Sequence, residues 1–226
     1  MKIAGREIPL RTVVQLVLVV GVLPMAALLV SWRWNWWEAW AYALLASVGF
    51  VVSRWLAVRH SPDLLEERAR SLEHSDVKPW DRTLAPLTAL SGLLIPIVAG
   101  LSARFGWSAA FGLPARLLAL AAMVAGYAFV TWALVENRFF SGVVRIQTER
   151  GHRVISTGPY AWLRHPGYAG ALLANLATPI LLEAPWAYLA CAVASGAVVV
   201  RTALEDRTLQ EEQGAVFQSG THDDRA

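Results

Sequence analysis

Residues 12–31, TVVQLVLVVGVLPMAALLVS, form an apolar run without a single charged side chain. A helix rises about 1.5 Å per residue, so a run of roughly 20 residues spans the hydrocarbon core of a bilayer. Pro24 lies within the run, but membrane helices tolerate proline as a kink. The run therefore predicts a transmembrane helix. Its length, and the lack of a small-residue cleavage site after it, distinguish it from a cleaved signal peptide.

Similar apolar runs follow along the chain. The last apolar region is interrupted by Glu183, Ala184 and Pro185, so we expect two short helices in a tight hairpin there. Overall, 56% of the residues are hydrophobic and 16% are charged, whereas about a quarter are charged in a soluble domain. The sequence predicts an all-α fold, a polytopic membrane helix bundle with five to six hydrophobic helices. The helices expected after the first are 38–57, 84–103, 114–135, 167–182 and 185–200.

Lys and Arg are distributed unevenly between the loops. The N-terminus, segment 54–82, segment 138–164 and the C-terminus hold three, six, five and three of them, seventeen of the 20 in the chain. The alternate loops hold only Arg33, Arg104 and Arg116. Because positive charge is retained on the cytoplasmic side, we expect both termini to be cytoplasmic. The tryptophans expected at the outer interface, as an anchoring belt, are Trp32, Trp34, Trp36, Trp37, Trp107 and Trp186.

Two segments are too polar for the bilayer core. Segment 61–76 places apolar residues at near-helical spacing among charges, which predicts a short helix lying on the inner surface. The other is 139–166, which the charge distribution places in the cytoplasm. The net charge of +3 comes without a basic run, so no nucleic-acid partner is expected. Cys191 is a lone cysteine in an apolar run, which indicates packing and excludes an internal disulfide, and no metal site is expected.

Residues 156–170 read STGPYAWLRHPGYAG. Gly158-Pro159 is a strong turn signal, and Pro166 both disfavours the α conformation at His165 and suits the first turn of a helix. A helix that begins at Pro166 would direct its free N–H groups and its dipole at Arg164 and His165. Such a place can hold a carboxylate or a phosphate. A capped helix with a snorkelling arginine explains the same residues equally well.

Two further elements favour function over capping. Arg201 and Glu205 are four residues apart and share one face of the last helix. Arg201 lies at the edge of the apolar run, where a charge needs a partner. The segment RIQTERGHRVI, 145–155, joins the fourth span to the turn, and its polar candidates are Gln147 and His152.

Together these residues form a specific pattern: G-P-Y, then R-H-P-x-Y-x-G, then R-x-x-x-E. The run IQTERGHRVISTGPYAWLRHPGYAG, followed by an apolar hairpin and RTALED, resembles the isoprenylcysteine carboxyl methyltransferase family. Phospholipid N-methyltransferases and bacterial thiol methyltransferases resemble members of the same superfamily. The resemblance covers 137–212, and the first half of the chain is similar only in consisting of membrane helices.

This resemblance suggests three regions. Residues 1–136 would hold the membrane helices with the interfacial segment near 61–76, and 137–212 a methyltransferase-like cofactor-binding region. Residues 213–226, QGAVFQSGTHDDRA, replace the G-Y-x-x-Y sequence and the basic, proline-containing tail of such relatives. We expect this divergent tail to be disordered.

The resemblance implies S-adenosylmethionine as methyl donor, bound on the cytosolic side without a Rossmann domain. Arg201 would face a lipophilic or membrane-delivered acceptor and, with Arg164, is a candidate catalytic residue. A carboxylate acceptor is already ionised at pH 7, and an arginine can orient it. The positions that the resemblance assigns to the donor are Gln147, His152, Arg153, Val154, Ile155, Tyr160, His165, Pro166, Gly167, Tyr168 and Glu205.

The acceptor is left open by the residues alone. An isoprenylcysteine-like carboxylate fits Arg201 better than a phospholipid amine does, and a small thiol is a further candidate. Membrane sterol-type reductases, which use NADPH, resemble the same C-terminal layout. The corresponding motif of those reductases resembles R-H-x-N-Y and follows a Trp-rich turn. This chain instead has G-P-Y before its R-H-P motif and Gly167 within it. A non-enzymatic membrane binding protein is the third alternative.

Overall fold

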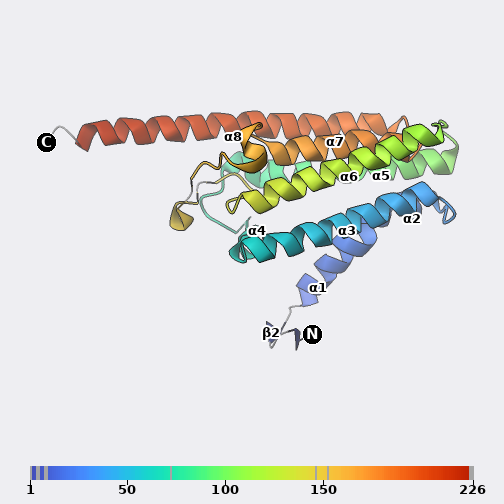
Figure 1. Ribbon diagram of the computed structural model, residues 1–226, viewed down its shortest axis with the longest axis horizontal. Coiled ribbons are helices and arrows are strands. Elements are labelled where there is room, and N and C mark those ends of the chain that lie inside the picture. Colours follow the sequence, from blue (N-terminus) through green and yellow to red (C-terminus); the bar gives the residue numbers. More distant parts are fainter. Residues whose placement is uncertain are drawn as a thin grey trace.

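The computed structural model of the chain describes the backbone of residues 2–3, 6–7, 10–71, 73–145, 147–151 and 153–223. Side chains are described for residues 10, 13–64, 67–68, 70–71, 73–145, 147, 149–151 and 153–211. Near the N-terminus, the two-residue strands β1 (Lys2–Ile3) and β2 (Arg6–Glu7) pair antiparallel. The rest of the described chain forms helices and their connections, as expected for an all-α bundle (Figure 1).

The first membrane helix is bent where its sequence contains proline. It consists of α1 (Leu10–Leu16), a π-helical segment Val17–Val22, a 3-10 turn Leu23–Met25 and α2 (Ala26–Ser31). Pro24 has no N–H to donate to the carbonyl four residues earlier. That carbonyl, Val20 O, instead accepts a hydrogen bond from Ser47 Oγ at 2.7 Å. The predicted span 12–31 is therefore present, but it changes direction between α1 and α2 (Figure 1).

Among the described residues, five helices are long and apolar enough to cross a membrane. They are Val13–Ser31, α3 (Trp37–His60), α5 (Pro79–Phe105), α6 (Leu113–Glu136) and the Ala187–Glu211 part of α8 (Ala187–Asp223). The helix α7 (Pro166–Leu181) has 16 residues, so it is only about 24 Å long and shorter than the hydrocarbon core. The expectation of five to six hydrophobic helices with a C-terminal hairpin is confirmed, and α7 is the short one.

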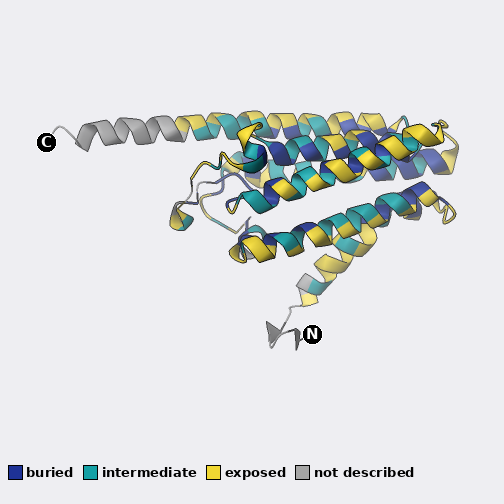
Figure 2. Ribbon diagram, viewed as in Figure 1, coloured by how far each residue is buried: buried dark blue, intermediate teal, exposed yellow. Residues whose placement is uncertain are grey.

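Small residues bring the helices of the bundle close together. A Cβ on Gly126 of α6 would lie 2.6 Å from Gly170 O of α7, and a Cβ on Gly170 would lie 2.6 Å from Gly126 O. Membrane helices pack through such small residues because lipid provides little hydrophobic drive for association. Buried residues concentrate where α5, α6, α7 and α8 face one another, whereas α1 is largely exposed (Figure 2). Outward apolar side chains such as Leu118, 72% exposed, suit contact with lipid.

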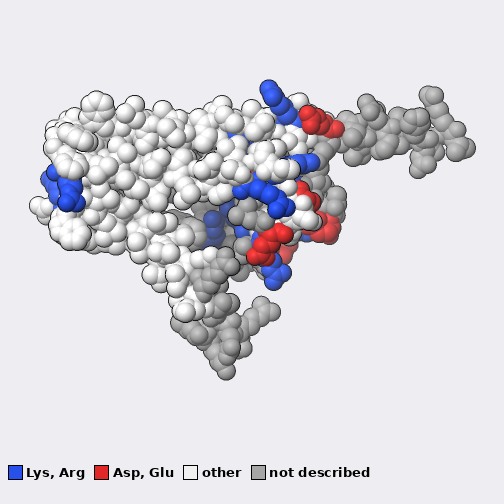
Figure 3. Space-filling model, turned by 180° about the vertical axis from the view of Figure 1, so that it is seen from behind, with Lys and Arg blue, Asp and Glu red and all other residues white. Residues whose placement is uncertain are grey.

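The two ends of the bundle differ in chemistry. We call the end that carries α4 (Asp63–Ala69) and the loop between α6 and α7 the charged end, and the end with the α2–α3, α5–α6 and α7–α8 connections the Trp-rich end. Charged side chains gather at the charged end, from which α8 projects, with one basic patch at the far end (Figure 3). The predicted interfacial helix is present as α4 but covers only seven residues. Its Leu64 is fully buried against Ala57 and Leu134, so α4 is packed onto the bundle.

Candidate active site

The turn before α7 is fixed to the C-terminal end of α6. Gly158 has φ +56°, a conformation that favours glycine, and a Cβ there would lie 2.7 Å from the Glu136 carboxylate. Thr157 Oγ1 donates to Glu136 Oε1 at 2.5 Å, and Tyr160 OH donates to Ala133 O at 3.3 Å. Burial raises the pKa of Tyr160 to about 12, so its phenol stays protonated at neutral pH. The predicted turn is thus present as a short 3-10 segment, Gly158–Ala161, docked on α6.

The helix α7 begins at Pro166, as the sequence predicts. His165 precedes it with φ −123° and ψ 62°, outside the helical region, and forms no side-chain cap. A Cβ on Gly167 would lie 2.9 Å from the Phe140 ring, so glycine allows this ring to pack against the first turn. Because the first N–H groups of a helix lack partners within it, this end of α7 can bind an anion.

Side chains from α7 and α8 meet next to this helix start. His165 Nε2 lies 3.0 Å from Asp206 Oδ1, and its Nδ1 lies 4.0 Å from Glu205 Oε2. Tyr168 OH donates to Glu205 Oε2 at 3.2 Å. The His165 and Tyr168 rings stack with centroids 5.5 Å apart. The structure therefore brings together three of the predicted donor-binding residues, and it adds Asp206. We call His165, Tyr168, Glu205 and Asp206 the His165 cluster.

Arg201 is held by a carboxylate from another helix. Its Nε and Nη2 donate to the two oxygens of Asp81, at 2.7 and 3.0 Å, and Nη2 also donates to Gly142 O at 2.8 Å. Asp81 is fully buried and accepts a further bond from Val144 N at 2.6 Å. The Arg201 guanidinium lies 5.9 Å from the Tyr168 ring centroid. Within the described part of the chain no hydrogen bond involves Nη1, so this nitrogen is the part of Arg201 left to face an acceptor.

The other predicted site residues lie in the connecting loop or at the start of α7. Gln147 is buried, donates from Nε2 to Phe139 O at 2.8 Å and accepts from Arg150 Nη1, so its amide is used within the loop. His152 lies outside the described residues. The exposed ones are Arg153, Val154 and Arg164, while Ile155 and Tyr160 are half-buried and Pro166 is buried.

A buried arginine fastens this loop to α4 and the segment after it. Arg145 is 5% exposed and binds Glu67 Oε1 at 2.9 Å, Asp76 Oδ2 at 2.9 Å and Glu149 Oε1 at 2.6 Å. The hydrogen bond from Arg145 lowers the pKa of the Glu149 carboxyl group. Because three carboxylates share one cation, the network orders residues from three parts of the sequence at the charged end.

Asp81 and Asp206 were not predicted as site residues. The apolar run predicted a third span from residue 84, which left Asp81 in the preceding loop, whereas α5 begins at Pro79. A carboxylate in the first turn of a membrane helix is a signal that could have identified it, because such a charge requires a partner. Asp206 follows Glu205 directly and could have been considered as a second carboxylate for His165.

An apolar groove is lined by residues of the two helices that carry Asp81 and Arg201. It has a volume of about 380 Å³ and lies between α5 and α8. Leu84 lies one helical turn beyond Asp81, and Ala197 one turn before Arg201. The remaining lining residues are Leu87, Leu90, Ser91, Leu94 and Val193.

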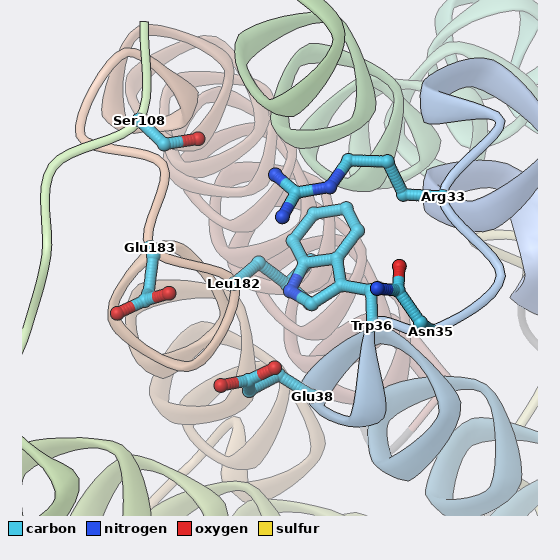
Figure 4. Close-up of a pocket in the computed structure, with 7 residues that line it drawn as sticks. All are labelled: Arg33, Asn35, Trp36, Glu38, Ser108, Leu182 and Glu183. Atoms are coloured by element: carbon cyan, nitrogen blue, oxygen red, sulfur yellow. The ribbon is translucent and has the colours of Figure 1, made fainter. Parts of the chain in front are cut away.

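A polar pocket lies at the opposite, Trp-rich end (Figure 4). Glu38 and Glu183 lie on one side of it, and Arg33 lies over the Trp36 ring, 6.0 Å from its centroid. Arg116 pairs with Glu38 and lies 3.7 Å from Glu183 Oε1. The carboxylates are thus balanced by nearby arginines where the connections of this end meet. No group of three His, Cys, Asp or Glu side chains suited to a metal ion occurs among the described residues at either end.

The region that contains the His165 cluster can be compared with known proteins. Residues 117–214, which comprise most of α6, the loop, α7 and much of α8, match the model of the Isoprenylcysteine carboxyl methyltransferase (ICMT) family. This region is similar to the ICMT family. The resemblance expected from the G-P-Y and R-H-P-x-Y-x-G motifs is therefore confirmed. Asp81 and α4 lie outside the ICMT match.

Curated relatives agree with this assignment. The chain is similar to the "Probable protein-S-isoprenylcysteine O-methyltransferase" of Oryza sativa subsp. indica, with 41% identity over 49 residues, 22% of this chain and 26% of the relative. It is also similar to "Protein-S-isoprenylcysteine O-methyltransferase B" of Arabidopsis thaliana, with 30% identity over 87 residues, 38% of this chain and 41% of the relative. The matches thus span about a quarter to two fifths of the length of these relatives. No solved structure matches the chain significantly.

Proposed function

We propose that the protein is an integral membrane methyltransferase that transfers a methyl group from S-adenosylmethionine to a lipophilic acceptor. The reaction we propose is carboxyl O-methylation of an isoprenylcysteine-like substrate. The observation that carries this proposal is the His165 cluster at the start of α7, because its residues come from the ICMT region and converge at one place. The charge distribution supports a cytoplasmic location for this end and for both termini.

The cluster has groups suited to the polar part of the donor. The start of α7 has free N–H groups for an α-carboxylate, and Glu205 and Asp206 can accept from an α-ammonium group. Both carboxylates are only partly exposed, so water competes weakly for these contacts. When bound, S-adenosylmethionine supplies an electrophilic methyl group on a sulfonium. Tyr160 is a candidate for contact with this cation.

The remaining donor-binding positions of the proposal lie in and around the loop. They include Gln147, whose amide would have to exchange its loop partners or act through them. The docked turn and the Arg145 network would hold the loop residues in place, so that little ordering remains to occur on binding. The residues proposed in addition to the His165 cluster are Gln147, His152, Arg153, Val154, Ile155, Tyr160, Pro166 and Gly167.

The acceptor would reach the site from the bilayer. The groove between α5 and α8 can hold an apolar chain, and its lining residue Ala197 lies one helical turn before Arg201. Asp81 fixes the Arg201 guanidinium, and Nη1 can donate to an acceptor oxygen. Methyl transfer is an in-line displacement, and a carboxylate nucleophile is ionised at pH 7, so positioning rather than a general base would supply the rate. Arg164 is exposed beside His165 and is a second candidate for contact with the acceptor.

The proposal is tested by donor binding. We expect detergent-solubilised protein to bind S-adenosylmethionine in calorimetry, and His165→Ala and Glu205→Ala to weaken binding by roughly 10- to 100-fold through loss of a charged hydrogen bond. Glu211→Ala, on an exposed position of the same helix, is the matched control and should bind normally. Binding of NADPH in place of S-adenosylmethionine would contradict the proposal, as would unchanged affinity in both site variants.

A further inference from the structure

Two half-buried arginines at the charged end, Arg54 and Arg68, have no carboxylate partner among the described side chains. Arg54 of α3 lies over the Phe50 ring, 4.7 Å from its centroid. Arg68 of α4 donates from Nη1 to Phe140 O at 3.0 Å and lies 5.2 Å from the Phe140 ring centroid. Both residues are half-buried. Aromatic and carbonyl contacts attract a guanidinium, but they do not neutralise it.

These arginines lie next to the proposed active site. The Phe140 ring that Arg68 covers also packs against Gly167, in the first turn of α7. Burial, together with the charges of Arg54 and Arg201, lowers the pKa of Arg68 to about 10. Ala57, one turn after Arg54 on α3, packs against Leu64, one turn before Arg68 on α4, so the two arginines flank the same helix–helix contact. Basic side chains are also visible within a hollow beside the exposed charges of this end (Figure 3).

The charge balance distinguishes this pair from the other buried cations. Arg201 is neutralised by Asp81, and Arg145 by three carboxylates. Arg54 lies six residues before the end of a membrane-spanning helix, where an uncompensated charge is expensive. An incoming anion would supply the missing compensation. Arg201 and Asp81 together carry no net charge, so any net positive charge at the site must come from other residues.

We propose that Arg54 and Arg68 bind the anionic group of the methyl acceptor and make the site selective for a carboxylate over a neutral or cationic group. This inference rests on the proposed methyltransferase function and specifies its acceptor. Arginine suits the role because its planar fork matches a carboxylate. Both residues lie outside 117–214, whereas the groups proposed for the donor lie within it. The donor's own carboxylate is provided for at the start of α7, which leaves the arginine pair to the acceptor.

The test compares two probes that differ only in charge. The full-length protein in phosphatidylcholine nanodiscs is titrated with N-acetyl-S-farnesylcysteine and, separately, with its neutral carboxamide. We expect the acid to bind about 10-fold or more tightly than the amide. Arg54→Gln and Arg68→Gln should each bring the ratio of affinities toward one without weakening the amide. Arg54→Lys and Arg68→Lys should keep part of the preference, because the charge remains while the fork is lost.

Arg59→Gln is the matched control. Arg59 is on the same helix as Arg54, is exposed and stacks on Trp55 at 3.9 Å, so its removal should leave the preference intact. An unchanged acid-to-amide ratio in both glutamine variants would overturn the proposal, as would a wild-type protein that binds neither probe. If a glutamine variant no longer binds the amide, the lysine variant at that position decides, and a lysine variant without any acid preference would overturn it.

Two further measurements separate other anions from the acceptor. Calorimetry with S-adenosylmethionine should give the same affinity in the wild type and in both glutamine variants, and a parallel loss would assign the arginines to the donor instead. Adding phosphatidylglycerol to the nanodiscs should not abolish the acid preference, and its abolition would assign the pair to lipid phosphate. A failure of the methyltransferase proposal would appear differently, as absent donor binding in the wild type with the acid preference still present.

Discussion

Replacing Asp81 tests the Arg201–Asp81 pair most directly. The carboxylate is fully buried and accepts two bonds from Arg201 and one from Val144 N. Asp81→Ala would leave a buried guanidinium uncompensated, which typically costs about 3–5 kcal/mol. For a chain of this size each kcal/mol shifts the melting temperature by about 2–4 °C, so we expect a decrease of roughly 6–20 °C. The melting temperature is measured in detergent as the temperature at which the monodisperse size-exclusion peak is lost.

The double variant Asp81→Leu/Arg201→Met separates stability from catalysis. It removes both charges. The Val144 N–H is left unpaired in Asp81→Ala as well, so the added cost in the double variant is the unsatisfied Gly142 carbonyl, about 1–3 kcal/mol, in place of the uncompensated guanidinium. We therefore expect the double variant to melt above Asp81→Ala while showing no methylation with radiolabelled donor. Arg207→Met, exposed on the same helix, is the control and should behave as the wild type in both assays.

Two outcomes would refute this reasoning. If Asp81→Ala melts with the wild type, the buried pair does not carry the stability that its geometry implies. If the double variant methylates a prenylcysteine analogue at the wild-type rate, Arg201 does not contact the acceptor, whatever it contributes to the fold.

Three other predictions concern the rest of the molecule. Gly170→Val should prevent α6 and α7 from packing, because its Cβ would lie 2.6 Å from Gly126 O. Gly196→Val is the control, since a Cβ there has nothing within 4 Å, and it should yield folded protein. Size-exclusion profiles of the two variants test this difference. Arg145→Met should destabilise the protein by about 3–5 kcal/mol, because it leaves the buried Glu67 carboxylate without its arginine partner. The melting temperature should fall, and an unchanged melting temperature would contradict the role given to the network. In a cysteine-free background, a cysteine at the exposed position 153 should react with an impermeant reagent only from the cytoplasmic side and one at exposed position 107 only from outside; the reverse labelling would invert the proposed orientation.

The spans were predictable because each depends on local composition. The runs at 38–57 and 114–135 correspond closely to α3 and α6, since apolar length alone determines where a helix can cross. The start of α7 was equally local, because Pro166 acts on its own neighbour. The third span was predicted too short, because a charged first turn with Asp81 resembles a loop when its partner is unknown.

The contacts of the site depended on positions far apart in sequence. His165 and Glu205 were both predicted, because each belongs to a motif, but their approach to 4.0 Å between Nδ1 and Oε2 required the geometry of the α7–α8 hairpin. Arg201 was predicted to need a partner and to face an acceptor, and the structure shows that the partner is Asp81, 120 residues earlier. No local pattern contains such a pairing.

The bond between Asp81 and Arg201 also links the histories of the two halves of the chain. The ICMT region contributes the arginine, and a helix outside the matched residues contributes the acid. A substitution of Asp81 therefore constrains which residue is tolerated at position 201, whereas the lipid-facing residues of α5 are free of this constraint. A descendant that loses the acid must lose or re-pair the arginine as well. A chimaera that joins this C-terminal region to foreign helices would need a carboxylate supplied at the same depth.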